Sequence, residues 1–135
     1  MQKQSLKKVL NADDPSACYV LGRHYNRTGG YWHASEILGR LVELTPDDAL
    51  ANYQLGVANL QQFSRRKEAI ENFRKAVDIC PQMVRAYRFL GWALVRVERD
   101  FAAARQLVDE LRQLRPNEAD RLAHLIALNE PCDER

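Results

Sequence analysis

Some segments of the chain contain arginine or aromatic residues but no aspartate or glutamate. Three such segments lie at residues 15–27, 49–61 and 84–97. Their arginines are Arg23, Arg27, Arg85, Arg88 and Arg96. A guanidinium group binds a carboxylate through two parallel hydrogen bonds, so these segments could recognise an acidic partner. Aromatic rings in the same segments offer flat apolar surface between the charges, and they belong to Tyr19, Tyr53 and Trp92.

The helical segment that follows each of these three carries acids. Among them are Glu36, Glu43, Glu68, Glu71, Asp78, Asp109 and Glu110. A chain whose formal net charge is only +2 is therefore expected to have one positive face. We expect that face to suit a peptide with acidic and apolar residues. The competing interpretation is that the arginines pair with acids on neighbouring helices while their stems cover apolar surface.

Patterns typical of catalysis or metal binding are weak. His24, His33 and His124 fall in different predicted elements, without the paired spacing of metal ligands. Gly29-Gly30 lacks the following Lys-Ser/Thr pair of a phosphate-binding loop. No nucleophile, base and orienting group stand out together. We therefore expect no enzyme, no catalytic residue, no metal and no cofactor.

Composition narrows the class of protein further. The three cysteines, Cys18, Cys80 and Cys132, are odd in number and widely spaced, which predicts reduced thiols in a cytoplasmic protein. The basic start of the chain lacks the apolar stretch of a secretory signal. No apolar run approaches the ~20 residues of a membrane span, so no membrane insertion is expected. The small net charge of +2 does not favour a nucleic-acid partner.

The elements that must position these residues repeat with a period near 34 residues. Prolines recur 35 residues apart, at Pro46, Pro81 and Pro116. Leu-Gly pairs and alanines recur in step with them, at Leu21-Gly22, Leu55-Gly56, Leu90-Gly91, Ala34, Ala69 and Ala104. A fixed period of this length is typical of stacked helical hairpins.

Amphipathic patterns and helix-end signals predict eight helices and no strand. Their ranges are 3–11, 15–27, 31–44, 49–61, 66–79, 84–97, 101–114 and 118–129. Asp14, Asp48 and Asn117 are the predicted N-caps. The Gly-to-Ala spacing is one residue longer in the second and third hairpins, which predicts longer turns near 63–66 and 98–100.

Small residues at one register predict close packing inside each hairpin. Gly22, Gly56 and Gly91 would let the first helix approach the second, which presents Ala34, Ala69 and Ala104. In the last helix, the residues expected to point inward are Leu122, Leu125, Ile126 and Leu128. Those expected to point outward are Glu118, Asp120 and Arg121.

These residues resemble the tetratricopeptide repeat, whose pattern is Trp-x2-Leu-Gly-x2-Tyr, then Ala-x3-Phe, then Pro. The second repeat reads Asn52-x2-Leu55-Gly56-x2-Asn59, then Ala69-x3-Phe73, then Pro81. The first reads Cys18-x2-Leu21-Gly22-x2-Tyr25, Ala34-x3-Leu38, Pro46, and the third reads Tyr87-x2-Leu90-Gly91-x2-Leu94, Ala104-x3-Val108, Pro116. None has the tryptophan of the pattern, but the small and proline positions match throughout.

The resemblance implies an all-α fold, a right-handed α-solenoid of three such hairpins with a C-terminal capping helix, as one structural domain. The expected divisions are a short helix and cap at 1–14, repeats at 15–48, 49–83 and 84–116, a capping helix at 117–129 and a tail at 130–135. The capping helix would cover the last hydrophobic stripe, as helical arrays require.

The resemblance also implies that the first helix of each hairpin lines a concave groove. The groove residues implied for a bound peptide are Tyr19, Arg23, Asn26, Arg27, Tyr53, Val57, Leu60, Arg85, Arg88, Trp92 and Arg96. Some members of the family clamp the terminal carboxylate of heat-shock chaperones. At the clamp positions this chain has Tyr19, Arg23, Gln54, Arg85 and Phe89, of which only Arg85 is a fair match, so that clamp is not expected.

The sequence therefore predicts a protein-interaction module, an adaptor, scaffold or chaperone-like protein with a protein or peptide partner rich in acids. Two alternatives stay open. One is a structural subunit that assembles with copies of itself, which an exposed Phe63 or Phe101 would favour. The other is a small secretion-type chaperone with the same kind of repeats, which would also bind a peptide.

Overall fold

The computed structural model describes residues 14–131, and within that range the chain is helical throughout, without a strand. The α-helices are α2 (Pro15–Thr28), α3 (Tyr31–Leu44), α4 (Ala49–Leu60), α5 (Arg66–Ile79), α6 (Val84–Arg96), α7 (Phe101–Leu114) and α8 (Pro116–Asn129). A short 3-10 helix, η1 (Phe63–Arg65), precedes α5. The helix predicted at 3–11 and the end of the predicted tail lie outside the described residues.

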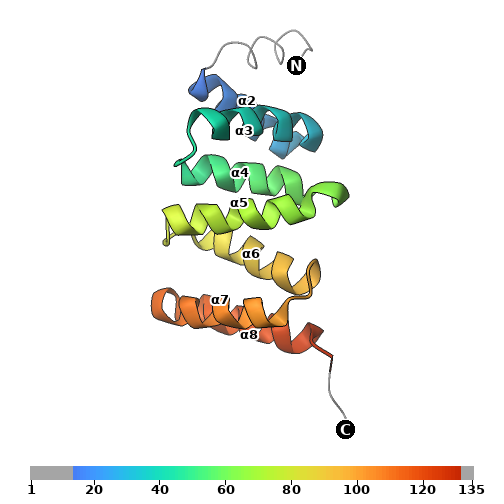
Figure 1. Cartoon of the computed structure of the whole chain (residues 1–135), viewed down its shortest axis with the longest axis vertical. Coiled ribbons are helices and arrows are strands. Elements are labelled where there is room, and N and C mark those ends of the chain that lie inside the picture. The colour runs from blue at the N-terminus through green and yellow to red at the C-terminus, as the bar shows by residue number, and fades with distance from the viewer. Residues whose placement is uncertain (1–13, 132–135) are drawn as a thin grey trace. The chain divides into compact units, whose positions relative to one another are not determined.

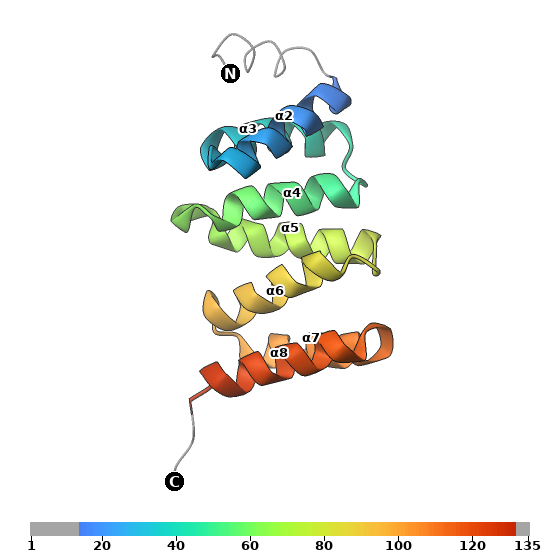
Figure 2. The same ribbon diagram turned by 180° about the vertical axis from the view of Figure 1, so that it is seen from behind.

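The chain forms two compact units that meet in the sequence at Cys80 and Pro81. In the first unit, α2 packs against α3, α4 packs against α5, and α3 also contacts α4. In the second unit, α7 and α8 lie side by side and α6 contacts both (Figures 1 and 2). None of the helices described is both long enough and apolar enough to cross a membrane.

Local signals in the sequence explain most of the helix ends. The Asp14 carboxylate accepts hydrogen bonds from the backbone N–H groups of Ser16 and Ala17, and Asp48 caps α4 in the same way. Gly29 ends α2 in the left-handed conformation, with φ of 88°. The prediction of Asn117 as an N-cap is wrong: α8 begins at Pro116, whose fixed φ suits the first helical position.

The two longer turns have the extra length that the sequence predicts. The turn after α4 contains η1, and the turn after α6 places Arg99 at a φ of 52°. Residues other than glycine rarely adopt that conformation, so the backbone of this turn is strained at Arg99. Its guanidinium group lies 5.2 Å from the centre of the Phe101 ring and donates to the Asn129 carbonyl, which joins this turn to the end of α8.

The core of the first unit depends on the small residues of the repeat. A Cβ atom at Gly22 would lie 2.5 Å from Cγ of Leu38, and one at Gly56 would lie 2.8 Å from Cε1 of Phe73. Both Leu38 and Phe73 are fully buried. The first helix of each of these hairpins therefore approaches the second as closely as the sequence predicts.

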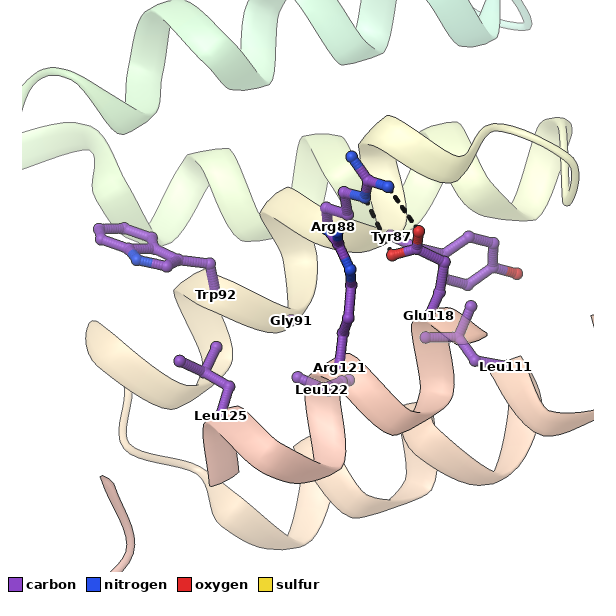
Figure 3. A pocket seen from close by; sticks show the side chains of 9 residues that line it. All are labelled: Tyr87, Arg88, Gly91, Trp92, Leu111, Glu118, Arg121, Leu122 and Leu125. Carbon is purple, nitrogen blue, oxygen red and sulfur yellow. Dashed lines mark hydrogen bonds and ion pairs between the residues drawn. The ribbon is translucent and has the colours of Figure 1, made fainter. Parts of the chain in front are cut away.

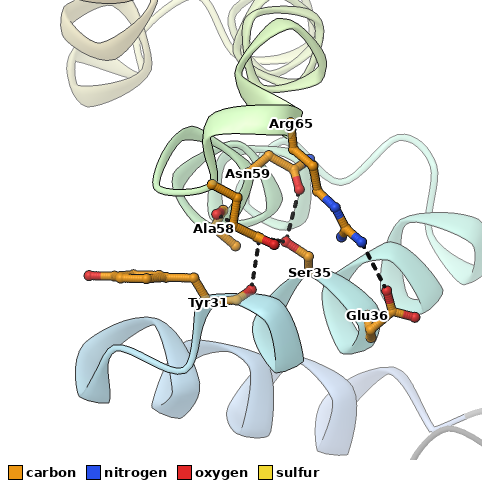
Figure 4. Close-up of polar contacts among 7 residues, drawn as sticks. Tyr31, Ser35, Glu36, Ala58, Asn59 and Arg65 are labelled. Atoms are coloured by element: carbon orange, nitrogen blue, oxygen red, sulfur yellow. Dashed lines mark hydrogen bonds and ion pairs between the residues drawn. The ribbon is translucent and has the colours of Figure 1, made fainter.

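A buried polar network also connects α3, α4 and α5 in this unit, and Figure 4 shows its part around Ser35 and Asn59. The Ser35 hydroxyl donates to Oδ1 of Asn59 at 2.8 Å, and Nδ2 of Asn59 donates to Oδ1 of Asn72 at 2.8 Å. Nε2 of Gln62 donates to the Ser35 hydroxyl and to the carbonyl of Tyr31. Because an unpaired buried amide is costly, this set of partners favours one register of the three helices.

The second unit is built differently around its glycine. A Cβ atom at Gly91 would lie 2.8 Å from Cδ1 of Leu122 in α8, and its nearest neighbours all belong to that leucine. The sequence predicted that Gly91 would instead admit the second helix of its own hairpin, α7. The α7 residue at the matching position, Val108, is shorter than Leu38 or Phe73, and Leu122 takes the place beside the glycine.

One of the inward positions predicted for α8 is wrong. Leu122 and Ile126 are buried and Leu125 is half-buried, but Leu128 is 68% exposed. Successive helical residues are about 100° apart, so Leu128 is turned by roughly 200° from Ile126 and faces away from the core.

Candidate functional site

The predicted groove residues divide between the two units. Those of the first unit lie on α2 and α4 and are Tyr19, Arg23, Asn26, Arg27, Tyr53, Val57 and Leu60. Those of the second unit all lie on α6 and are Arg85, Arg88, Trp92 and Arg96. Each set is therefore described within its own unit.

In the first unit, α2 supplies the exposed charge. Arg23 and Arg27 are both exposed, and neither forms an ion pair with any residue between 14 and 131. Nδ2 of Asn26 donates to the carbonyl and to Oε1 of Gln54, each at 3.0 Å, which fixes α2 against α4. Tyr19 is half-buried beside the core.

The α4 residues of the predicted set contribute less surface. Tyr53 is 8% exposed, and its ring centre lies 6.0 Å from that of Phe73 in α5. Leu60 is 5% exposed and belongs to the core, whereas Val57 is half-buried. The first unit thus presents two unpaired arginines of α2 beside a mostly apolar α4.

In the second unit, Arg85 and Arg96 are exposed and have no ion pair among the described residues, but Arg88 is paired. Nε of Arg88 donates to Oε2 of Glu118 at 2.9 Å, and Nη2 donates to Oε1 at 2.5 Å. This is the two-point geometry in which a guanidinium binds a carboxylate most strongly. The competing interpretation, that the arginines pair with acids of neighbouring helices, thus describes Arg88.

Glu118 was expected to point outward from the capping helix, and that expectation is wrong. Its side chain is only 12% exposed, whereas the Arg88 side chain is 52% exposed. Glu118 lies in the first turn of α8, where the helix dipole favours a negative charge and where the side chain can reach back to α6. The hydrogen bond from Arg88 lowers the pKa of Glu118 most, and the charges of Arg88, Arg121 and Arg115 lower it further, against a smaller rise from burial.

A pocket of about 260 Å³ opens beside this pair, between α6 and α8 (Figure 3). Its lining is mostly apolar, and Figure 3 shows Trp92 on the α6 side with Leu122 and Leu125 on the α8 side. The complete lining is Tyr87, Arg88, Gly91, Trp92, Leu111, Glu118, Arg121, Leu122 and Leu125. Trp92 is 38% exposed, so its ring forms part of the open wall. The pocket can take an apolar group while the charged residues hold a polar one.

Sequence reasoning found Arg88 and Trp92 but missed the part of the pocket that α8 supplies. Glu118, Arg121, Leu122 and Leu125 follow the i, i+3, i+4, i+7 pattern of one helical face. That pattern could have revealed a mixed charged and apolar face on the last helix. The sequence analysis instead predicts that this helix is a capping helix with its charged residues in solvent, because a helical array needs a polar cap at its end.

Two other exposed aromatic residues lie away from this pocket. Phe63 in η1 is 86% exposed and Trp32 in α3 is 55% exposed. The Arg66 guanidinium lies 5.5 Å from the centre of the Phe63 ring. Phe101, the other residue named as a contact for self-assembly, is half-buried.

Metal-binding geometry is not found in the described part of the chain, where no three His, Cys, Asp or Glu side chains gather around one point. Of the cysteines there, Cys18 is buried and Cys80 is half-buried, and neither forms a disulfide bond within residues 14–131.

No protein-family model matches the chain. A curated relative, the tetratricopeptide repeat and J domain-containing co-chaperone DNJ1 of Cryptococcus neoformans, is 29% identical over 124 residues. The match covers 89% of this chain but only 23% of the relative, so the chain spans less than a quarter of that protein.

Solved structures match most of the chain. One of them is the TPR2B domain of yeast Sti1 in a complex with pHsp70. The match has a TM-score of 0.69 at 21% identity, and it covers 84% of this chain and 96% of the Sti1 chain. The first TPR of Spaghetti (RPAP3), bound to the HSP90 peptide SRMEEVD, has a TM-score of 0.65 at 18% identity, with coverages of 84% and 94%. A crystal structure of MamA has a TM-score of 0.64 at 25% identity, with coverages of 93% and 68%.

These matches confirm the predicted fold class, which is all-α, with helical hairpins and a C-terminal helix. The repeated Leu-Gly, Ala and Pro positions, the hairpins they build and these matches lead to one conclusion: the chain has the tetratricopeptide repeat fold.

Proposed function

We propose that the chain is a cytoplasmic protein-interaction module, and not an enzyme, whose ligand is a peptide segment with acidic and apolar residues. Within the first unit the ligand would lie on the surfaces of α2 and α4, and within the second unit it would lie on the surface of α6. The observation that carries the proposal is a set of exposed arginines on helices that contain no acid, and none of them forms an ion pair with a residue from 14 to 131. They are Arg23, Arg27, Arg85 and Arg96.

Physical chemistry favours a carboxylate as the partner of these arginines. A guanidinium is weakly hydrated and matches a carboxylate at two points, so an exposed one is ready to bind an acid without losing an internal partner. Apolar surface is also available on the same helices. On α2 it comes from the half-buried ring of Tyr19, and on α6 it comes from the exposed part of Trp92. A peptide that combines acids with apolar side chains meets both requirements.

The structural neighbours support the same class of ligand. The peptide bound to Spaghetti, SRMEEVD, combines three acids with methionine and valine. The residues that clamp a terminal carboxylate in some family members are mostly replaced here, as at Tyr19 and Phe89. We therefore propose recognition of acidic side chains within a segment, which requires no free carboxyl terminus.

A binding measurement tests this proposal. Fluorescence anisotropy would follow labelled, N-acetylated and C-terminally amidated peptides in which glutamate alternates with leucine, with glutamine-leucine peptides as the neutral comparison. Charge-assisted hydrogen bonds contribute about 1.5–3 kcal/mol each, so the double variant R23E/R27E should weaken binding of the acidic peptide at least about tenfold.

A matched control is the double variant R74E/K75E, which reverses two exposed charges on α5. It changes the net charge of the chain by the same amount and should leave binding nearly unchanged. If both double variants weakened binding of the acidic peptide equally, the effect would come from the net charge of the chain and not from the positions of Arg23 and Arg27. Failure of the wild-type chain to distinguish the acidic from the neutral peptides would refute the proposal.

Self-assembly is a second candidate, and the exposure of Phe63 (86%) favours it. An aromatic ring this exposed at the tip of a turn could pack against another copy. Light scattering over a range of concentrations separates the two candidates, since a constant molecular mass would reject self-assembly. A secretion-type chaperone would behave as a peptide-binding module in both experiments.

A further inference from the structure

The pocket between α6 and α8 has the size and lining for one apolar side chain. Its volume of about 260 Å³ is below the ~300 Å³ at which pockets for whole small-molecule ligands begin. Leu111, Leu122 and Leu125 supply aliphatic contacts, and the exposed part of Trp92 forms a flat wall. Burial of one leucine or methionine side chain there would remove apolar surface on both sides from water.

The two arginines that line the pocket differ in whether they have a carboxylate partner among the described residues. Arg88 is held at two points by Glu118. Arg121 lines the same pocket, is exposed, and has no hydrogen bond or ion pair to another described residue. In Figure 3 the Arg121 side chain extends from α8 toward the Arg88–Glu118 pair. The pocket lining therefore contains two guanidinium groups and one carboxylate, which gives it a net positive charge.

We propose that this pocket binds an apolar side chain of a peptide in which a neighbouring residue is aspartate or glutamate. We propose in addition that Glu118 is an internal competitor, which occupies Arg88 until the carboxylate of the peptide displaces it. The inference rests on the proposed function and makes it more specific, since it assigns a subsite and gives the reason why a neutral peptide should bind more weakly.

The exchange of carboxylates is feasible because neither partner would be left buried and alone. Arg88 is 52% exposed, so a ligand can reach its guanidinium from solvent. Glu118, once released, stays near Arg121 and Arg115, and the first turn of α8 still favours its charge. An apolar residue without an acid cannot replace Glu118, so it would gain only the contacts of the pocket.

The two tryptophans of the chain make the subsite measurable. Trp92 lines the pocket in the second unit, and Trp32 lies in α3 of the first unit. In a Trp32→Phe background, the fluorescence of Trp92 reports directly on this pocket. The probes are the amidated glutamate-leucine peptide and its glutamine-leucine counterpart.

The test compares Glu118→Gln with Glu130→Gln. Glu130 pairs with Arg105, whose side chain is also 52% exposed, and neither residue lines the α6–α8 pocket. Both variants add the same charge and release one arginine. An exposed ion pair is typically worth up to about 1 kcal/mol, so Glu118→Gln should tighten binding of the acidic peptide by about two- to fivefold. Glu130→Gln should leave it unchanged, and the neutral peptide should respond to neither variant.

Several results would overturn the inference. One is a Glu118→Gln variant with a lower melting temperature but an unchanged or lower affinity for the acidic peptide, which would make Glu118 a structural residue only. Another is saturation of binding without any change in Trp92 fluorescence. In either case the R23E/R27E experiment could still succeed, so failure of this inference is distinguishable from failure of the proposed function.

A second variant covers the case in which Glu118→Gln does not fold. Glu118→Asp keeps the charge at the start of α8 but shortens the side chain by one methylene, so it weakens the two-point contact with Arg88. It should shift the affinity for the acidic peptide in the same direction by a smaller factor. A lower affinity for the acidic peptide in this variant would contradict the competitor role.

Discussion

The two units of this chain use the same sequence marks and pack them differently. In the first unit, the glycine in the first helix of each hairpin faces a large side chain of the second helix. Gly22 faces Leu38 and Gly56 faces Phe73. In the second unit, Gly91 faces Leu122 of the capping helix α8. The position equivalent to Leu38 and Phe73 is Val108, which is too short to fill the space over a glycine. The change of partner at Gly91 thus coincides with a shorter side chain at position 108.

This difference has a functional consequence. The hairpins of the first unit are closed by interdigitated side chains and by the amide network around Asn59. In the second unit, α6 lies against α8, and the space between them remains open as a pocket. The polar contact there is a half-exposed ion pair, Arg88–Glu118, which a ligand can exchange more easily than a buried amide. The glycine positions of the first unit are closely packed, whereas the second unit has an open pocket beside its glycine.

The largest expected effect comes from truncation of the side chains that fill the glycine positions. Phe73→Ala should cost about 3–5 kcal/mol of unfolding free energy and Leu122→Ala about 2–3 kcal/mol. Val108→Ala removes two carbons and should cost no more than about 2 kcal/mol. Urea denaturation followed by circular dichroism would give this order, with Trp32 and Trp92 fluorescence reporting on their own units. A larger cost for Val108→Ala than for Leu122→Ala would contradict the packing difference.

A smaller effect is expected from added methyl groups at two of the glycines. In Gly56→Ala the new Cβ would lie 2.8 Å from the ring of fully buried Phe73, so overpacking should cost about 1–3 kcal/mol despite the better helix propensity of alanine. In Gly91→Ala the neighbour is the end of Leu122, which can move into the adjacent pocket. That variant should be within about 0.5 kcal/mol of the wild type, because alanine's helix propensity offsets the remaining strain.

Thermal unfolding of the two glycine variants provides the measurement. Equal melting temperatures would mean that both sites are packed alike and would remove the contrast between the units. Gly91→Ala should in addition weaken binding of the acidic peptide, because the displaced Leu122 side chain takes up volume in the pocket.

The smallest expected effect is a pH dependence that belongs to the second unit. The pKa of Glu118 is lowered from its ordinary 4.5, chiefly by the hydrogen bond from Arg88. A carboxyl group with a lowered folded-state pKa stabilises the fold above its ordinary pKa, and this contribution is lost as the pH falls below 4.5 through the folded-state value. The melting temperature of the wild type should therefore exceed that of Glu118→Gln near neutral pH, and the two should converge in acid.

Melting curves at several pH values would test this convergence. A difference that stays constant from neutral pH into strong acid would mean that Glu118 acts through packing and not through its charge. The expected shift is small, since Arg88 is half-exposed and solvent screens such pairs.

The sequence by itself determined the period, the hairpins and most of the helix ends. Pro46, Pro81, Asp14 and Asp48 act through local backbone geometry and short-range hydrogen bonds, so their effect can be inferred without knowledge of the fold. The absence of aspartate and glutamate from the first helix of each hairpin can also be recognised without knowledge of the fold, because it is a property of the sequence alone. The predicted bounds of α3, α5 and α7 agree with the structure for this reason.

Tertiary structure decided which side chains meet. The partner of Gly91, the burial of Tyr53 and Leu60, and the pairing of Arg88 with Glu118 depend on contacts between residues far apart in the sequence. Periodicity places a residue on a helical face, but the size of the facing side chains sets how the helices pack. The pocket beside Arg88 is a product of that packing, because its lining combines residues of α6 with residues of α8, and Leu122 of α8 lies over Gly91 of α6.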